Sequence, residues 1–289
     1  MDRWTPSARY QKIAAANRAF YAAVATQYDD SETCVCDPAA QGMLEEDLED
    51  ILRRCRGAPH ALSALDACGG SGNVSLKLLR RGVRVTLVDI SPELLDIFRR
   101  KCAIAGTEAA TEVCEIASFL AKHPAQFDLI VFSSALHHLE DIEGVLRLAH
   151  GALTPGGLLF TVFDPTSTGQ STPVTRALLR LDYTLFKVLD QTSDLPAALR
   201  RRLRRRLSNA GAHRKTDIDL DENTAGMLAE YHVEEGIDDL ALVDALTGMG
   251  FEVVRHERYA TARHRWIRRL LEATGAVSSF KLLLRKAGG

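Results

Sequence analysis

A glycine-rich turn directly follows a short apolar segment at residues 65–73, which read Leu-Asp-Ala-Cys-Gly-Gly-Ser-Gly-Asn. An apolar strand that enters such a turn and then a helix brings bare backbone close to a ligand, because glycine has no Cβ and tolerates positive φ. Asp89 ends the next apolar segment, about twenty residues further on, where a carboxylate can accept hydrogen bonds from both hydroxyls of a ribose. The turn and the acid together predict a nucleoside pocket.

The turn resembles motif I of the class I S-adenosylmethionine-dependent methyltransferases, in which an acid and an apolar residue precede Gly-x-Gly-x-Gly. Asp66 matches the acid, and Gly70 and Gly72 match the last two glycines. Cys68 stands where the first glycine is usual, and we expect the neighbouring Gly69 to supply the missing conformational freedom. The acid after the next strand matches motif II. A dinucleotide dehydrogenase stays the alternative for the glycine motif alone, although the pattern differs from G-x-G-x-x-G.

Further segments match the same family in chain order. Glu115 falls where the family carries an acid that binds the adenine amino group, with Ile116 beside the ring. Residues 127–141 resemble the fourth strand and its histidine-bearing loop, and residues 153–160 resemble a helix end, a proline-glycine turn and the fifth strand. The resemblance implies S-adenosylmethionine as cofactor and S-adenosylhomocysteine as its product. The residues assigned to the cofactor are Tyr28, Asp66, Cys68, Gly69, Gly70, Gly72, Asp89, Ile90, Glu115, Ile116 and Ser133.

The alternation of apolar and helical segments indicates an α/β fold with a parallel sheet and right-handed crossovers. The resemblance implies a Rossmann-like, seven-stranded, mostly parallel sheet of order 3-2-1-4-5-7-6, with the last strand antiparallel. Strands are expected near residues 61–67, 83–89, 109–115, 127–133, 157–164, 251–256 and 280–285.

Four regions are expected along the chain. They are an N-terminal helical cap at 1–60, a Rossmann-like cofactor-binding core at 61–164, a helical lid inserted after the fifth strand at 165–236, and the C-terminal completion of the core at 237–289. The lid contains an amphipathic stretch at 174–189 and an arginine-rich run at 200–206. The arginines are either a phosphate-binding surface for RNA or a solvated helix face balanced by the acidic stretch 217–222.

His137 and His138 follow the fourth strand, beside the expected position of the activated methyl group. Methyl transfer requires an in-line arrangement of the reacting atoms, and it requires a base where the acceptor is a hydroxyl. Consecutive side chains cannot both face the same way, so we expect at most one of the two histidines to act as that base. Asp164, at the end of the fifth strand, is expected either to face that histidine or to cap the turn before Pro165.

Composition narrows the functional classes. The 289-residue chain has a formal net charge of −2, so no global charge attracts nucleic acid or an anionic membrane. Six scattered cysteines suit free thiols in a reducing cytoplasm, and no cluster of His, Cys, Asp and Glu has metal-ligand spacing. The chain shows no signal peptide and no transmembrane stretch. We expect a cytoplasmic enzyme with no metal and no DNA partner, and the apolar face of the lid allows a homodimer.

The predicted function is methyl transfer from S-adenosylmethionine to a small, hydrophobic or aromatic acceptor, with oxygen favoured, in the small-molecule branch that includes the ubiquinone and menaquinone methyltransferases. Natural product biosynthesis is a typical setting for such an enzyme. Nucleic-acid N-methyltransferases of this fold carry Asn/Asp-Pro-Pro-aromatic where this chain has Ser133-Ser134-Ala135-Leu136. Two alternatives stay open: an RNA-modifying methyltransferase that uses the arginine-rich lid, and a cofactor-binding protein with lost or altered chemistry, such as a natural-product cyclase or regulator.

Overall fold

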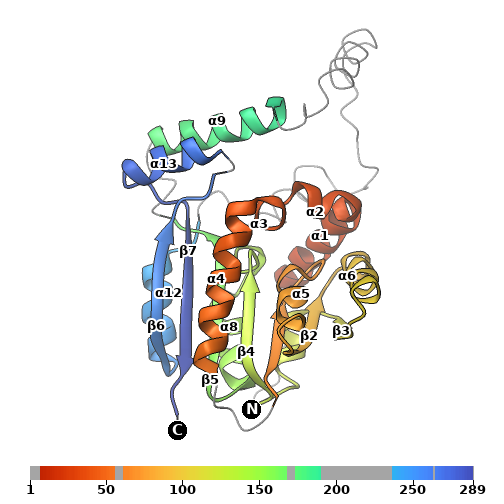
Figure 1. Ribbon diagram of the computed structural model, residues 1–289. Coiled ribbons are helices and arrows are strands. Elements are labelled where there is room, and N and C mark those ends of the chain that lie inside the picture. Colours follow the sequence, from red (N-terminus) through yellow and green to blue (C-terminus); the bar gives the residue numbers. More distant parts are fainter. Residues whose placement is uncertain (1–6, 56–60, 168–172, 190–235, 263, 289) are drawn as a thin grey trace.

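The computed structural model describes residues 7–55, 61–167, 173–189, 236–262 and 264–288. Its strands form one seven-stranded sheet in the order β3-β2-β1-β4-β5-β7-β6, with helices on both faces (Figure 1). Neighbouring pairs among the first five strands are parallel, and β7 is antiparallel to both β5 and β6. The predicted α/β class, strand order and antiparallel strand are confirmed. The strands are β1 (Ser63–Ala67), β2 (Arg84–Asp89), β3 (Ala110–Val113), β4 (Phe127–Ser133), β5 (Leu153–Pro165), β6 (Phe251–Tyr259) and β7 (Ser279–Lys286).

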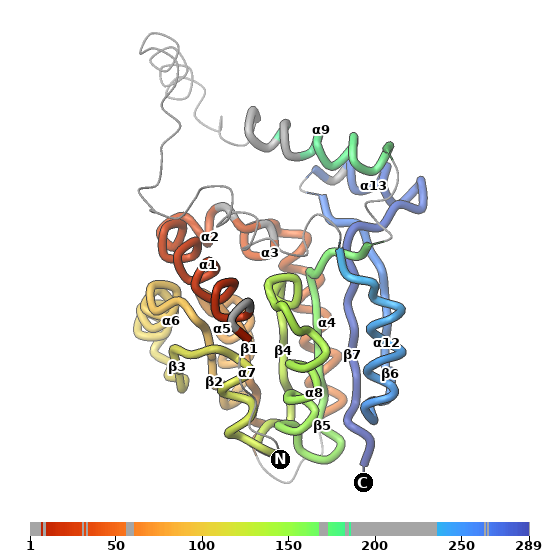
Figure 2. The backbone as a smooth tube through the Cα atoms, turned by 180° about the vertical axis from the view of Figure 1, so that it is seen from behind, coloured from red at the N-terminus to blue at the C-terminus, as the bar shows by residue number. Residues whose placement is uncertain are grey.

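The helices cover the sheet as two layers. Apolar contacts place α4, α5 and α6 on one face and α7, α8 and α12 on the other (Figure 2). Helices α1 to α3 lie across the end of the sheet where β1, β2 and β4 finish. The helices are α1 (Ala8–Val24), α2 (Tyr28–Ser31), α3 (Thr33–Cys36), α4 (Pro38–Cys55), α5 (Asn73–Leu79), α6 (Pro92–Ala105), α7 (Ile116–Leu120), α8 (Ile142–Ala152), α9 (Pro173–Leu189), α12 (Asp239–Gly248) and α13 (Arg265–Ala273), with 3-10 turns η1 (Ala25–Gln27) and η2 (Leu136–His138).

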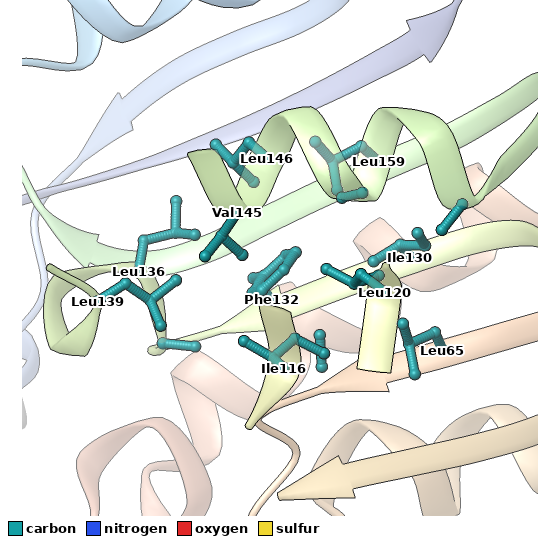
Figure 3. Packing of buried hydrophobic residues seen from close by; sticks show 14 of the residues in the cluster. Leu65, Ile116, Leu120, Ile130, Phe132, Leu136, Leu139, Val145, Leu146 and Leu159 are labelled. Carbon is teal, nitrogen blue, oxygen red and sulfur yellow. The ribbon is translucent and has the colours of Figure 1, made fainter. Parts of the chain in front are cut away.

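Strand β4 forms the centre of the core. Six of its seven residues are buried, which accounts for its nearly continuous apolar sequence, since a central parallel strand is covered on both faces. On one face Phe132 packs among Ile116 of α7 and Val145 of α8 (Figure 3). This packing fixes the carboxyl end of β4, where the histidine-bearing loop begins.

Local sequence signals set the helix boundaries. Ser91 begins α6 by accepting a hydrogen bond from the backbone N–H of Leu94, with proline at the first helical position, and Gly106 ends it at φ +64°. Asp141 and Asp238 cap α8 and α12 in the same way. Each cap stabilises its helix by about 1 kcal/mol, so the helices that follow β2 and β4 start at defined residues.

Helices α9 and α13 pack against each other beyond the carboxyl ends of the strands (Figure 1). Leu178, Leu179 and Leu185 of α9 contact a cluster that includes Ile267 and Leu271 of α13. Part of the apolar face predicted for residues 174–189 is thus covered by this chain itself. The arginine-rich run at 200–206 lies outside the described residues. Over the part of the chain that is described, no helix is long and apolar enough to cross a membrane.

Candidate functional site

The glycine-rich turn after β1 has a left-handed backbone at three positions. Cys68, Gly70 and Gly72 have φ values of +56°, +54° and +81°. Cys68 therefore adopts the conformation that glycine usually supplies, and Gly69 does not have positive φ, contrary to the expected compensation. Gly69 is instead required by close packing, because an added Cβ would lie 2.6 Å from Cγ of Asp66. A Cβ on Gly72 would lie 2.1 Å from the ring of Phe98.

Asp66 lies beneath this turn and is fully buried. Its Oδ2 accepts hydrogen bonds from the backbone N–H of Ser75 at 2.9 Å and from the Ser75 hydroxyl at 2.6 Å. Burial raises the pKa of Asp66 to about 6, against the lowering effect of those two bonds. The residue ties the turn to the first turns of α5, as expected of an orienting acid.

Asp89, at the end of β2, holds the turn from the other side. Its Oδ2 accepts a hydrogen bond from the backbone N–H of Gly70 and its Oδ1 one from the backbone N–H of Ser91, both at 2.8 Å. Burial raises the pKa of Asp89, against the lowering effect of these donors. Each carboxylate oxygen has a second lone pair, so the group can accept further hydrogen bonds from a ligand.

A cleft opens between the strand ends and helix α1. Asp89 and Ile90 line it below the cap, and Glu115 and Ile116 line it at the start of α7. Burial raises the pKa of Glu115, while Arg18 acts in the opposite direction. The expected residues that line this cleft are Tyr28, Cys68, Gly70, Asp89, Ile90, Glu115, Ile116 and His138. A smaller cavity under the turn is lined by Asp66, Gly69 and Ser133, together with Tyr28 and Cys68.

The cap segment is fastened to the turn by polar contacts. Asp29 accepts a hydrogen bond from the Ser71 hydroxyl at 2.5 Å and pairs with Nζ of Lys101 at 2.6 Å. On α1, Nε of Arg18 donates to the backbone carbonyl of Ile90 at 3.1 Å. These contacts place the N-terminal helices over the cleft as a cover.

His138 and Tyr21 face each other in the cleft. The Tyr21 hydroxyl lies 2.7 Å from Nε2 of His138, and the two rings meet edge to face with centroids 5.6 Å apart. Burial, and next the nearby Glu32 carboxylate, raise the pKa of Tyr21 above its ordinary value, so the phenol stays protonated. The hydroxyl can therefore donate a hydrogen bond to a neutral His138.

His137 is turned toward Asp164, although its ring centroid lies only 3.9 Å from that of His138. Its Nδ1 lies 2.8 Å from Oδ1 of Asp164, and the same oxygen accepts the backbone N–H of His137 at 3.2 Å. Both residues are buried, and neither lines the cleft. The predicted pairing of a histidine with Asp164 is thus formed by His137, whereas His138 is the histidine that reaches the cleft.

Several cleft residues were not predicted. Tyr10, Ile13, Asn17 and Tyr21 line it from α1, which reads in the sequence only as a helix with apolar positions. Asn17 donates from Nδ2 to the backbone carbonyl of His138 at 3.2 Å, and its buried Oδ1 has no hydrogen-bond partner among the described residues. Small polar and aromatic residues on such a helix give no signal of a site until the fold places them opposite β4.

A second cavity of about 580 Å³ lies beside the cleft, and Ser134 lines both. It is bounded by α3 and α4, by the ends of β5 and β6, and by α9 and α13. Residues from each boundary line it, including Cys34, Met43, Phe163, Asp182, Tyr259 and Arg268. No group of three or more His, Cys, Asp or Glu residues suited to a metal occurs among the described residues.

Comparison with known proteins identifies the central region. Residues 64–157 match the family model described as "Methyltransferase domain". The "tRNA 5-carboxymethoxyuridine methyltransferase" of Escherichia coli (strain K12) is 31% identical over 125 residues, which are 43% of this chain and 47% of that protein. The "Ubiquinone biosynthesis O-methyltransferase" of Xanthomonas euvesicatoria pv. vesicatoria (strain 85-10) is 32% identical over 114 residues, 39% of this chain and 46% of that protein. The chain thus matches under half the length of each relative.

Solved structures match over nearly the whole chain. A (4+2)-cyclase, SpnF, aligns with a TM-score of 0.60 and 13% identity, covering 99% of this chain and 98% of that one. The Burkholderia thailandensis 1,6-didemethyltoxoflavin-N1-methyltransferase aligns with a TM-score of 0.54 and 16% identity, covering 98% and 93%. At these identities the likeness concerns the fold. Residues 64–157 therefore form a methyltransferase domain, within the fold of the class I S-adenosylmethionine-dependent methyltransferases.

Proposed function

We propose that the chain transfers a methyl group from S-adenosylmethionine to an oxygen of a small organic acceptor. The observation that carries this proposal is the cleft at the carboxyl ends of β1, β2 and β4, where the glycine-rich turn, Asp89 and Glu115 converge under the N-terminal cap. Ligands of open α/β sheets bind at such strand ends. The domain match and the relatives named as O-methyltransferases support the same reaction.

The residues of the cleft fit the cofactor. Asp89 has acceptor capacity left for the ribose hydroxyls, and Glu115 is an acceptor suited to the adenine amino group. Ile90 and Ile116 supply apolar surface for the adenine ring. The unpartnered Oδ1 of Asn17 supplies one more buried acceptor, which a donor on the cofactor would satisfy.

His138 is the proposed base. When bound, S-adenosylmethionine supplies a methyl carbon on a positively charged sulfur, and displacement by the acceptor oxygen returns the bond electrons to the sulfur. The hydroxyl proton then needs an acceptor, and imidazole is suited to this near neutral pH. The Tyr21 hydroxyl holds the ring through its hydrogen bond to Nε2 before the acceptor binds. An acceptor hydroxyl that replaces the phenol at this nitrogen can pass its proton to His138.

We propose that His137 and Asp164 act indirectly, by positioning the turn that carries His138. The bonds from Asp164 to the backbone and ring of His137 fix the start of the turn η2, and with it the direction in which His138 projects. The two residues therefore support the geometry of the cleft without contact with the acceptor.

The second cavity is the proposed acceptor site. It adjoins the cleft at Ser134, and α9 and α13, which follow β5 and β6, bound it. Its apolar walls, including Met43, Phe163 and Tyr259, suit a hydrophobic or aromatic body.

We also propose that the enzyme acts in the cytoplasm, since its six cysteines are all free thiols.

Mass spectrometry tests the reaction. The purified chain is incubated with S-adenosylmethionine and a small-molecule extract, and S-adenosylhomocysteine and products one methylene heavier are followed. His138→Ala should lower the rate by about a hundredfold while affinity for S-adenosylhomocysteine is kept, and Tyr21→Phe should lower it less. Equal rates for wild type and His138→Ala would remove this histidine from the mechanism.

Two alternatives predict different products. The relative named as a tRNA methyltransferase favours RNA as acceptor. Radiolabel from the methyl group would then enter RNA, and substitution of the arginines at 200–206 would abolish a steeply salt-dependent binding. The structural likeness to SpnF, named as a cyclase, favours a cofactor-binding protein without methyl transfer. In that case the cofactor binds but no S-adenosylhomocysteine forms.

A further inference from the structure

We propose that an aromatic corner of the cofactor cleft, completed by a buried amide oxygen, recognises the positive charge of the sulfonium, so that the chain binds S-adenosylmethionine more tightly than S-adenosylhomocysteine. The aromatic corner consists of Tyr21, Tyr28 and His138, and Asn17 supplies the oxygen. All four residues line the cleft. This inference rests on the proposed function, since it takes that cleft as the cofactor site.

Three rings meet in the aromatic corner. The ring centroid of Tyr21 lies 5.9 Å from that of Tyr28 at an interplanar angle of 71°, and 5.6 Å from that of His138 at 89°. Rings that meet near right angles form adjoining walls instead of a flat stack. The face of an aromatic ring carries partial negative charge, and proteins bind quaternary ammonium groups between such walls. The corner therefore suits a cation that has no N–H or O–H to donate.

The aromatic corner lies between the proposed ribose acceptor and the proposed base. Tyr28 packs on the glycine-rich turn, since a Cβ added to Gly70 would lie 3.4 Å from its hydroxyl oxygen and 3.6 Å from its ring carbon Cε1. The backbone N–H of Gly70 donates to Asp89, which is the ribose acceptor. His138, the base, stands at the other side of the corner. In the cofactor the sulfur is one methylene away from the ribose and carries the methyl group, so it belongs to this interval.

Asn17 adds a carbonyl dipole to the aromatic corner. Its Nδ2 donates to the backbone carbonyl of His138 at 3.2 Å, which fixes the orientation of the amide and turns Oδ1 away from that carbonyl. The residue is 8% exposed, and Oδ1 has no hydrogen-bond partner among the described residues. Buried polar atoms are nearly always satisfied, so this oxygen marks the place of a ligand group. The polarised C–H groups next to a sulfonium are weak donors that can satisfy it.

The charge of the sulfonium meets no fixed positive charge in the lining. Among the described residues that line the cleft there is no lysine or arginine. Methyl transfer converts the sulfonium to a neutral thioether, so the product loses its attraction to the rings and to the amide oxygen. The aromatic corner and Asn17 therefore distinguish the two states of the cofactor, and they favour release of the product.

Three ligands that differ at the sulfur test this charge recognition. They are S-adenosylmethionine, S-adenosylhomocysteine, and sinefungin, which has an amine-bearing carbon in place of the methylated sulfur. Their affinities for the purified chain are measured by calorimetric titration with no acceptor present. S-adenosylmethionine should bind about tenfold more tightly than S-adenosylhomocysteine, equivalent to about 1.4 kcal/mol, and sinefungin should also bind more tightly than S-adenosylhomocysteine. Equal or tighter binding of S-adenosylhomocysteine than of the two cationic ligands overturns the proposal.

Matched variants separate the ring of Tyr21 from its hydroxyl. Tyr21→Phe keeps the ring and removes the hydrogen bond to His138, so the preference for S-adenosylmethionine should persist. Tyr21→Leu removes the ring, and Asn17→Leu removes the carbonyl dipole; each should reduce the preference by about threefold. Phe20→Leu is the control, because Phe20 meets Tyr21 edge to face with centroids 5.3 Å apart and does not line the cleft. A preference that Tyr21→Leu and Asn17→Leu both leave at the wild-type value contradicts the assignment.

The two levels of the proposal fail differently. Absence of binding of all three ligands to the wild-type chain would refute the proposed function together with this inference. Binding of all three with equal affinity would refute the recognition of the sulfonium alone. Circular dichroism melts confirm that each variant used in the comparison is folded.

Discussion

Replacement of Asp89 by asparagine separates the structural from the ligand-binding role of this carboxylate. In the folded chain each of its oxygens accepts one backbone hydrogen bond at 2.8 Å, from Gly70 and from Ser91. Asparagine has one acceptor oxygen, so one buried backbone N–H loses its partner and faces the amide NH₂ group. The cofactor would also lose an ionised acceptor for its ribose.

Two magnitudes follow from this geometry. An orphaned buried donor costs about 1–3 kcal/mol, so the free energy of unfolding should fall by that amount. Loss of a charge-assisted acceptor toward the ribose costs about 2 kcal/mol, which corresponds to roughly a thirtyfold weaker affinity for S-adenosylhomocysteine. The first is measured by urea unfolding and the second by calorimetric titration.

Asp128→Asn is the matched control. Asp128 is also buried and accepts the backbone N–H of Ser63 at 2.9 Å and the Thr154 hydroxyl at 3.1 Å, at the opposite end of the sheet. The Asp128→Asn chain should have a lower free energy of unfolding and should keep the wild-type affinity for S-adenosylhomocysteine. An Asp89→Asn chain that folds and binds S-adenosylhomocysteine as tightly as wild type would refute the ribose assignment.

Two further predictions concern the glycine-rich turn. Gly72→Ala should lower the free energy of unfolding by about 3 kcal/mol, because alanine is strained at φ +81° and its Cβ meets the Phe98 ring; a loss below about 1 kcal/mol in urea unfolding would contradict the clash. Burial raises the pKa of Asp66 to about 6 from 3.8. The contribution of this residue to the free energy of unfolding is therefore present below the pKa of the unfolded chain, 3.8, and is lost as the pH rises toward 6. Relative to Asp66→Asn, the wild type should therefore be more stable at about pH 5 than at about pH 7.5, and a difference that does not change with pH would argue against the buried acid.

The strands and their parallel pairing could be predicted because their signals are local, whereas the strand order was implied by the resemblance to the methyltransferase family. Apolar strands, glycine turns and helix caps alternate from β1 to β5, and their order determines the parallel core. The start of β5 was placed too late. Pro155 and Gly156 are typical of a turn, yet Leu153 already pairs with Phe127 across an irregularity in the ladder, a contact that depends on the neighbouring strand.

An N-terminal cap was expected, but the residues through which it contacts the cleft could not be predicted in the same way. Tyr21 and His138 are 117 positions apart and meet only because α1 packs beside η2, the turn that follows β4. The choice between the two histidines likewise depends on the direction in which each projects from η2, which Asp164 determines by binding His137. Such contacts depend on tertiary structure, and neither residue type nor spacing encodes them.

The most direct test of the account is native mass spectrometry of the purified chain titrated with S-adenosylmethionine. The account predicts a one-to-one complex whose population falls sharply in Asp89→Asn and is kept in Asp128→Asn, at a cofactor concentration near the wild-type dissociation constant. Absence of any complex with the wild-type chain, or a complex that Asp89→Asn leaves unchanged, would contradict the assignment of this cleft to the cofactor.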